Sequence, residues 1–418
     1  MTSSTVCAPE CHSLSNNNAP FGALAVKQKA SEITRILRVA SRECGILATT
    51  PIYLFCMVIF PIITILFFTF LLDSGQPQEM PIGVVDLDKT STTRALILRL
   101  DGMQTSHVAA YFATPADARK AIQRNKIYAF LYIPQGTTEN LLSARQPKVS
   151  FYYTGTSLTA AAMLMRDLKT VCTLGSAAVG QATMQARGFT QQQITTFLQP
   201  IAVDLHAVGN PWTSYNIYLS TFIIPGILLL FIFLVSAYSI GTELKFHRSD
   251  ELMRISGNDI YAAIIGKFLP QTLIWLIIVY GYMWYVFGHL GFPHPGGTWL
   301  IALIGLLAVL ASEGFGIFIF GIIPSLRMSM SICSLWGVLS FSTCGAAFPI
   351  FAMDTPITAM AQLFPLRHYY MVYQLNIFNG YPMEIAWFNY MALGIFICLP
   401  LFVMKSIRKA MTEYVYIP

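Results

Sequence analysis

Six long apolar runs constrain this chain more than any other feature of its sequence. A helix needs about 20 mostly apolar residues to cross the hydrocarbon core of a bilayer, and each run is close to that length or longer. The runs cover residues 51–72, 214–240, 260–287, 299–323, 328–353 and 385–404. Only 11% of the 418 residues are charged, whereas soluble domains contain about 25%. The sequence therefore predicts a membrane-embedded, all-α bundle of six transmembrane helices.

Basic residues lie mainly on one side of these predicted spans. The opposite loops have none between residues 288 and 298 and only Arg367 between 354 and 384. Because Lys and Arg accumulate in cytoplasmic loops, we expect both termini, including a tail over 405–418, in the cytoplasm. The residues on the basic side are Lys27, Lys29, Arg35, Arg38, Arg42, Lys245, Arg248, Arg254, Arg327, Lys405, Arg408 and Lys409.

The residues before the first span divide into a tail and an amphipathic segment. Residues 1–25 are predicted to be a flexible cytoplasmic tail. A metal site could be drawn there from Cys7, Cys11 and His12, but that spacing without a second pair favours an unstructured tail, and no metal site is expected.

Residues 26–46 are predicted to form an amphipathic helix at the inner membrane surface. Ile33, Leu37, Ala40 and Cys44 share one helical face, and charged residues lie away from it. An alternative is a helix that packs on a soluble partner.

A polar insertion of residues 73–212 separates the first two spans and is predicted to be an extracytoplasmic α/β domain, because strand patterns alternate with helical ones. The predicted strands are 82–86, 107–112, 128–133 and 149–153, and the predicted helices are 91–100, 115–125 and 157–187. We find no catalytic set. Asp86 and Asp88 resemble a carboxylate pair, although a turn at the end of a strand explains them equally well.

Residues 241–259 form a short charged segment between the second and third spans. It is predicted to be a cytoplasmic loop, and it is long enough for a short amphipathic helix in which Leu244, Glu251 and Met253 would face the membrane surface. We interpret it as the segment that receives force from a partner protein.

Glu313 is the one acidic residue deep in a predicted span. A carboxylate is costly at that depth, so we expect it to face the helix bundle, beside water or hydroxyl donors. It could line a pathway or exchange protons, or it could simply be paired with a hydroxyl group.

Residues 354–384 are too polar and too interrupted by proline to span a bilayer. They are predicted to form short re-entrant or interfacial helices on the outer side, with tyrosines at the level of the lipid headgroups. The candidate residues in and next to this segment are Pro349, Pro365, Arg367, Tyr369 and Tyr370.

Nucleotide-binding and hydrolytic motifs are missing from the sequence. A phosphate-binding loop requires G-x-x-x-x-G-K-[ST], but Phe268 follows Gly266-Lys267, and Tyr261 stands where the first glycine belongs. The sequence has neither an HExxH motif nor a Gly-x-Ser-x-Gly elbow. We therefore expect no catalytic residue and no cofactor bound by this chain.

Three stretches of the sequence resemble those of a known family. The first is Gly241-Thr242-Glu243-Leu244, continuing to Gly266-Lys267. The second is Gly345-Ala346-Ala347-Phe348-Pro349, followed by Leu363-Phe364-Pro365-Leu366-Arg367-His368-Tyr369-Tyr370 and Gly380. The third runs from Ala116-Asp117-Ala118 through Tyr128 to Pro134. In this order, over residues 26–410, the sequence resembles ABC-2 type exporter permeases that carry a large extracytoplasmic domain between the first two spans.

The resemblance implies a type V exporter-like fold and outward transport of a hydrophobic or amphipathic substrate, such as a drug, a lipid or an envelope component. Cytoplasmic ABC ATPase subunits, which bind ATP and Mg, would dock on segments 26–46 and 241–259. The coupling residues would be Glu243, Leu244, Arg248, Glu251 and Arg254.

The other implied partners are a second permease subunit, identical or different, membrane lipid and a periplasmic adaptor, but no nucleic acid. The implied location is the bacterial inner membrane. The alternative is a membrane anchor or signalling protein that transports nothing and whose outer domain binds an envelope partner. An intramembrane enzyme is a third and poorer hypothesis.

Overall fold

The computed structural model describes residues 21–143, 145–198, 210 and 213–413. The predicted metal site at Cys7, Cys11 and His12 lies outside these residues, as does most of the predicted tail 1–25. The chain forms two compact units: one comprises Met1–Phe67 and Phe222–Pro418, and the other comprises Phe68–Thr221.

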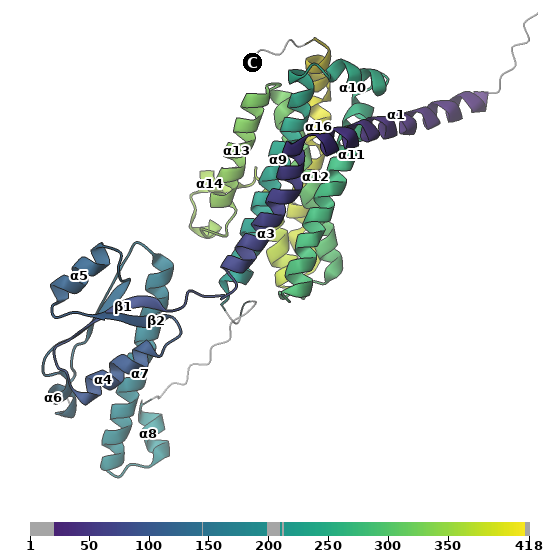
Figure 1. The fold of residues 1–418 in the computed structure, drawn as a ribbon. Helices are drawn as coiled ribbons and strands as arrows, with labels where there is room; N and C mark the ends of the chain where they lie inside the picture. The colour runs from purple at the N-terminus through teal and green to yellow at the C-terminus, as the bar shows by residue number, and fades with distance from the viewer. Residues whose placement is uncertain (1–20, 144, 199–209, 211–212, 414–418) are drawn as a thin grey trace, which may run out of the picture. The chain divides into compact units, whose positions relative to one another are not determined.

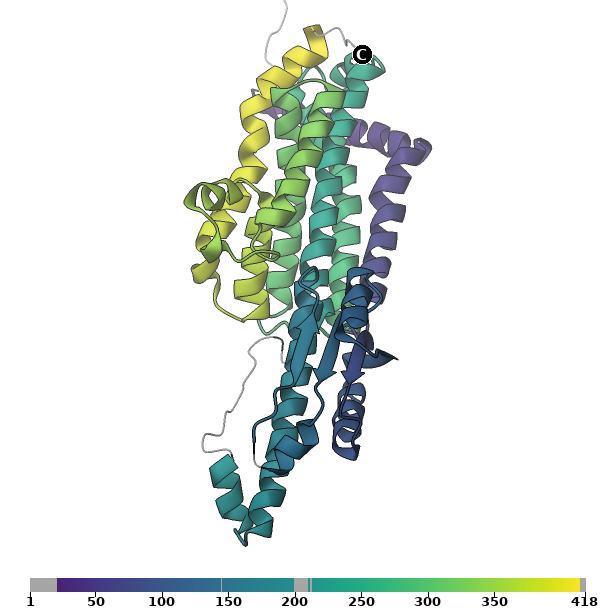
Figure 2. The ribbon, with the colours of Figure 1, turned by 90° about the vertical axis from the view of Figure 1, so that its left-hand side faces the viewer.

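The first unit is a bundle of long apolar helices that run side by side (Figures 1 and 2). Five helices in the described part of the chain are long and apolar enough to cross a membrane. They cover Pro51–Leu71, Asn216–Lys245, Ile260–His289, Thr298–Ile322 and Met383–Glu413. The structure therefore supports five of the six predicted spans by length and composition.

The predicted span 328–353 is the exception. Its helix, α13 (Leu326–Thr343), has 18 residues, about 27 Å at 1.5 Å per residue, and with Arg327, five serines and Thr343 it is less apolar than the five candidate spans. The chain leaves the helix next to Gly345, whose φ of 101° no helix contains. The apolar run continues to 353, but the helix does not.

The spanning helices are built from the following elements. The first contains α2 (Pro51–Leu54), the π-helical turn η1 (Phe55–Ile59) and α3 (Phe60–Leu71). The second contains η2 (Asn216–Ser220) and α9 (Thr221–Lys245), and the third contains α11 (Ile260–Met283) and η3 (Trp284–His289). The last two are α12 (Thr298–Ile322) and, after η6 (Met383–Ala386), α16 (Trp387–Glu413). Helix α16 continues past the predicted end of the sixth span at 404.

Two further helices pack against one end of this bundle. Helix α1 (Phe21–Thr49) runs at a steep angle to α3 (Figure 1), and the short α10 (Ser249–Ile255) follows α9. Val39 of α1 and Leu252 of α10 belong to one buried core with Ile240 of α9, Phe320 of α12 and Ile407 of α16. The C-terminal part of α16 is helical because it covers this core.

The predicted apolar face of α1 is divided in the structure. Ala40 is buried, but Ile33 and Leu37 are 63% and 57% exposed, and Cys44 is exposed. The buried face instead includes Val39. The helix therefore packs on the protein with one side and presents a separate apolar side outward.

The segment 354–384 contains short helices, as predicted: α14 (Thr355–Ala361), α15 (Pro365–Val372) and η5 (Tyr373–Phe378), after η4 (Ile350–Ala352). Two of the tyrosines that were predicted at the level of the lipid headgroups are buried. Tyr369 and Tyr370 are 4% and 5% exposed, so their rings pack inside the protein and not on its outer surface.

The second unit is the predicted α/β insert. Its sheet has the order β2-β1-β3-β4, with β1 (Met80–Asp86), β2 (Ser106–Tyr111) and β3 (Ala129–Ile133) parallel and β4 (Ser150–Tyr153) antiparallel to β3. Helices α4 (Ser91–Asp101) and α7 (Leu158–Ala186) cover one face, and α5 (Pro115–Gln123) covers the other. Helices α6 (Thr137–Leu142) and α8 (Gln191–Leu198) were not predicted.

Threonine caps begin two helices of the insert. Thr114 caps α5, since its side chain accepts a hydrogen bond from Asp117 N. Thr90 caps α4, since its side chain accepts a hydrogen bond from Thr93 N. The Thr93 hydroxyl in turn accepts a hydrogen bond from Thr90 N, which completes a reciprocal capping box.

Candidate functional site

Lys267 on α11 is the centre of a buried network of charges. Its Nζ donates hydrogen bonds to Glu43 Oε2 on α1 at 2.8 Å and to Glu243 Oε1 on α9 at 2.7 Å. The three side chains are 1%, 1% and 3% exposed. One lysine therefore ties α1 to two spanning helices.

Arg42 extends this network to α10. Its guanidinium donates to both carboxylate oxygens of Glu243 at 3.0 Å and to Glu251 Oε2 at 3.2 Å. A bidentate arginine–carboxylate pair fixes geometry better than a single contact does. Burial lowers the pKa of Arg42, but Glu243 and Glu251 outweigh this effect and leave the pKa above its ordinary value.

Polar side chains complete the network on its inner side. Gln271 Nε2 donates to Glu43 Oε1 at 2.8 Å and to Ser239 Oγ at 2.7 Å. The buried network thus contains two acids, Glu43 and Glu243, and two bases, Arg42 and Lys267. This balance matters because an unpaired charge is far more costly in a buried site than a paired one.

The predicted coupling residues occupy two different environments. Glu243 is 3% and Leu244 4% exposed, so both belong to the interior. Arg248, Glu251 and Arg254 are exposed on or next to α10. The structure brings Glu243 and Glu251 together through Arg42, but it does not join all five residues in one site.

The turn between α9 and α10 carries an aromatic residue that the sequence analysis missed. Phe246 is 55% exposed, and the cationic groups of Lys245 and Arg248 both lie 5.6 Å from its ring centroid. An exposed aromatic side chain beside cations is typical of an anchor at a protein interface. The one feature of the sequence that could have pointed to Phe246 is that it is a phenylalanine within a charged segment.

Glu43 and Lys267 were not predicted as site residues either. The sequence offered one signal, a lone lysine near the start of an otherwise apolar run. Its partner lies 224 positions away, on a helix that periodicity alone places at the membrane surface. No local pattern could have paired them.

Glu313 lies in the interior of the bundle, as its charge led us to expect. It is 4% exposed, and its Oε2 lies 2.6 Å from Thr272 Oγ1 on α11. Its Oε1 accepts no hydrogen bond, and no cation forms an ion pair with it within the described residues. Gln271 contacts the charge network and Thr272 contacts Glu313, and these two residues are consecutive on α11.

The outer-segment candidates are mostly buried. Arg367 is 8% exposed and donates to the Cys344 carbonyl at 3.2 Å. Pro365, Tyr369 and Tyr370 are buried on the same helix, α15. Pro349, in contrast, is exposed. These contacts join α15 to the end of α13.

Asp86 and Asp88 in the insert act as turn residues. Asp86 Oδ1 accepts from the backbone N–H groups of Asp88 and Lys89, both at 3.0 Å. Asp88 accepts from Gly136 N at 2.8 Å and Thr138 N at 3.0 Å. The Thr138 hydroxyl and these N–H groups hold the pKa of Asp88 below its ordinary value, against a smaller effect of burial. The bonds favour the strand-end turn over a catalytic pair.

Comparison with known proteins gave one informative result. A family model described as "ABC-2 family transporter protein" matches residues 51–404, from the first predicted span to the last. No curated protein matched the chain. In the described part of the chain, no group of three or more His, Cys, Asp or Glu side chains could hold a metal ion.

Proposed function

The chain belongs to the ABC-2 transporter family, and on that premise we propose that it exports a hydrophobic or amphipathic substrate with energy from a separate ATPase subunit. It is a membrane permease of this family, whose members lack the nucleotide-binding domain. ATP and Mg would be bound by the partner. The substrate class, the direction of transport and the partner are parts of the proposal.

The observation that carries the proposal is the buried charge network. Arg42, Glu43, Glu243 and Lys267 join α1, α9 and α11, and Glu251 adds α10. Helices α1 and α10 also share one apolar core with the spans. A partner that displaces α1 or α10 would therefore move α9 and α11 with them, since packed elements move as bodies.

We place the docking surface on the turn and helix that follow α9. Phe246, Arg248 and Arg254 are exposed there, whereas Glu243 and Leu244 would act from the interior by transmitting the movement. Glu251 is both exposed and bonded to Arg42. A cation on the partner could compete for Glu251 and so loosen α10 from α1.

The proposed topology follows the distribution of basic residues. With α13 as a sixth, short span, both termini and α10 lie in the cytoplasm and the α/β insert lies outside. A helix of about 27 Å can span by local thinning of a bilayer. The proposed location is the bacterial inner membrane, with a second permease subunit and, on the outer side, an adaptor as further partners.

Glu313 is proposed to be a polar site on the transport pathway. Support comes from its depth in α12, its unpaired Oε1 and its link through Thr272 to the helix that carries Lys267. The segment with Pro349, Pro365, Arg367, Tyr369 and Tyr370 is proposed to be the outer closure of that pathway.

Photo-crosslinking tests the docking surface. A benzoylphenylalanine replacing Phe246 should crosslink to a co-expressed ABC ATPase. The same group replacing Phe197, an aromatic residue of the insert that is more exposed still at 74%, should not. A crosslink at 197 without one at 246 would refute the proposed docking surface. If no ATPase is captured or co-purified, the alternative of a non-transporting anchor or signalling protein is favoured.

A further inference from the structure

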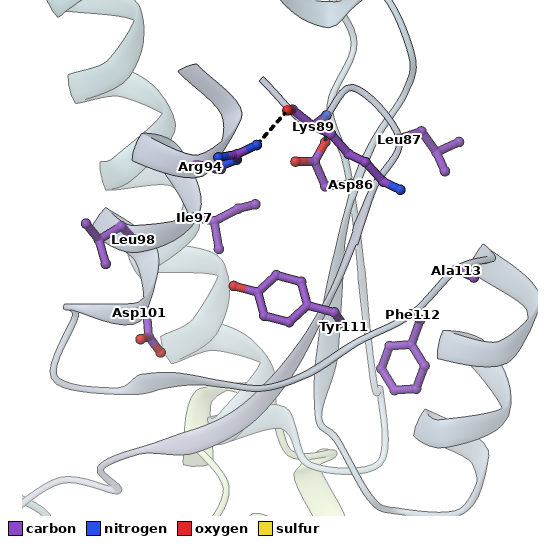
Figure 3. A pocket seen from close by; sticks show the side chains of 10 residues that line it. All are labelled: Asp86, Leu87, Lys89, Arg94, Ile97, Leu98, Asp101, Tyr111, Phe112 and Ala113. Carbon is purple, nitrogen blue, oxygen red and sulfur yellow. Dashed lines mark hydrogen bonds between the residues drawn. The ribbon is translucent and has the colours of Figure 1, made fainter. Parts of the chain in front are cut away.

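The α/β insert contains a cavity that the proposed coupling does not involve. Its volume is about 770 Å³, which lies within the range of about 300–1,000 Å³ usual for small-molecule sites. Helix α4 lines one side, and the carboxyl ends of β1 and β2 line the other (Figure 3).

This cavity does not lie at the usual ligand position of an open α/β sheet. That position is the crevice at the carboxyl ends of the strands where the strand order reverses, here between β1 and β3. Asp88 fills this crevice by accepting hydrogen bonds from Gly136 N and Thr138 N. The open space therefore lies on the other side of β1, towards β2.

The acidic side chains that line the cavity already have donors. Asp86 Oδ1 accepts two backbone N–H bonds, and its Oδ2 accepts the Thr93 hydroxyl at 2.8 Å. Asp101 Oδ1 accepts Val108 N at 2.7 Å and lies 3.2 Å from His107 Nδ1. These hydrogen bonds hold the walls in place and partly offset the two negative charges.

The donors that line the cavity are, in contrast, largely unused. Lys89 Nζ and the Tyr111 hydroxyl make no hydrogen bond or ion pair with the described residues. Arg94 uses one N–H, from Nη2 to the Lys89 carbonyl at 3.3 Å. Figure 3 shows Arg94 directed towards that carbonyl and the Tyr111 hydroxyl directed towards α4. The surplus of donors favours an anion.

Apolar side chains form the rest of the lining. Leu98 is 72% and Leu87 40% exposed, and Ile97 lies deeper at 5%. We propose that this cavity binds a small anionic amphiphile. Its phosphate, sulfate or carboxylate group lies against Lys89, Arg94 and Tyr111, and its apolar part lies along Leu98 and Ile97. The inference does not rest on coupling to an ATPase and can fail while that coupling holds.

Hydrogen–deuterium exchange of the full chain in phosphatidylcholine nanodiscs tests this site directly. The probes are dihexanoylphosphatidylglycerol, an anionic lipid, and 1-naphthyl phosphate, which is not a lipid. At least one should protect residues 86–101 and 107–113 in a saturable way, and the one that does identifies the source of the ligand. Dihexanoylphosphatidylcholine, with the same chains but no net charge, should protect them at least tenfold less well.

Variants of the donors provide the control. The pair Lys89→Gln and Arg94→Gln should weaken probe binding about tenfold or more. The matched pair Arg99→Gln and Lys126→Gln removes the same charge at exposed sites outside the cavity. This pair should change probe binding less than twofold. Tyr111→Phe, which removes only the hydroxyl, should weaken it severalfold. Three results would overturn the proposal: equal protection by the zwitterionic lipid, an equal loss of probe binding in both pairs of variants, or no protection by either anion.

Discussion

Lys267 pairs with two buried carboxylates in the interior of the membrane unit. Its ammonium group lies within 2.8 Å of oxygens of both Glu43 and Glu243. Glu243 has a second cation in Arg42, but Glu43 has no other cationic partner within the described residues. Loss of Lys267 therefore leaves Glu43 as a buried, unpaired carboxylate.

We expect Lys267→Gln to destabilise the protein by about 3–5 kcal/mol, because it uncovers a buried charge. Thermal unfolding of the purified chain measures the effect. Lys405→Gln, an exposed change on α16, should be nearly neutral. Adding Glu43→Gln to Lys267→Gln should recover part of the loss, since the remaining pair, Arg42 and Glu243, stays balanced. If the double variant were less stable than either single one, the assigned pairing would be wrong.

Substitutions of Glu313 can separate the effect of its side-chain shape from the effect of its charge. The Thr272 hydroxyl lies 2.6 Å from Glu313 Oε2 and 2.9 Å from the Phe268 carbonyl. In Glu313→Gln the new amide can donate to Thr272 while Thr272 donates to Phe268. We therefore expect Gln to change stability by less than about 0.5 kcal/mol and Leu to cost about 1 kcal/mol.

A second measurement separates the roles of Glu313. If its charge serves transport, Glu313→Gln should assemble with the ATPase but show reduced stimulation of ATP hydrolysis. Normal stimulation in the Gln variant would assign Glu313 a structural role only.

Among the secondary-structure elements, α1 and α11 approach each other closely at Gly266, and the proposed coupling passes through this crossing. A Cβ atom at Gly266 would lie 2.7 Å from the Ile36 carbonyl oxygen and from Val39 Cβ of α1. Only glycine permits so close an approach, one residue before Lys267. The short distance keeps Glu43 and Lys267 within hydrogen-bonding range.

Gly266→Ala should therefore push α1 away from α11 and lower stability by about 1–3 kcal/mol. It should also expose the start of α11 to hydrogen exchange. Gly281→Ala on the same helix is the control, because a Cβ there would meet nothing within 4 Å. Similar effects of the two variants would contradict the proposed close crossing.

In the insert, Asp88 links the end of β1 to the start of α6. Its pKa is lowered in the folded state, so its contribution to stability is present above the unfolded pKa of about 3.9. That contribution disappears as the pH falls through the lower, folded pKa.

Asp88→Asn should therefore be less stable than the native chain at pH 7, and the difference should shrink as the pH falls below about 4. Thermal unfolding from pH 7 to pH 3 measures it. Glu139→Gln, an exposed change in α6, is the control and should give a smaller difference at pH 7. A constant difference for Asp88→Asn would exclude its ionised form as the stabilising species.

For the whole molecule, the sequence predicted the class and most of the elements. The apolar runs identified the spans because hydrocarbon requires about 20 apolar residues per crossing. Alternating strands and helices identified the insert. The run at 328–353 was misleading, since hydropathy does not register the turn at Gly345.

The candidate site was predicted only in part. Residues 241–259 attracted attention through their charge density, but Glu43 and Lys267 meet only after α1 folds across α11. Phe246 is exposed because α9 ends at Lys245 and the chain turns. Both facts depend on tertiary structure, which a single sequence does not show.

The most direct test of the account is ATP hydrolysis by the chain co-purified with its ATPase in nanodiscs. We predict that the bound ATPase hydrolyses ATP several times faster than the free subunit. Phe246→Ala should remove this stimulation without unfolding either protein, and Phe197→Ala should leave it intact. An ATPase whose rate is the same with and without the chain, or unaffected by Phe246→Ala, would contradict the claim that this permease is driven through α1 and α10.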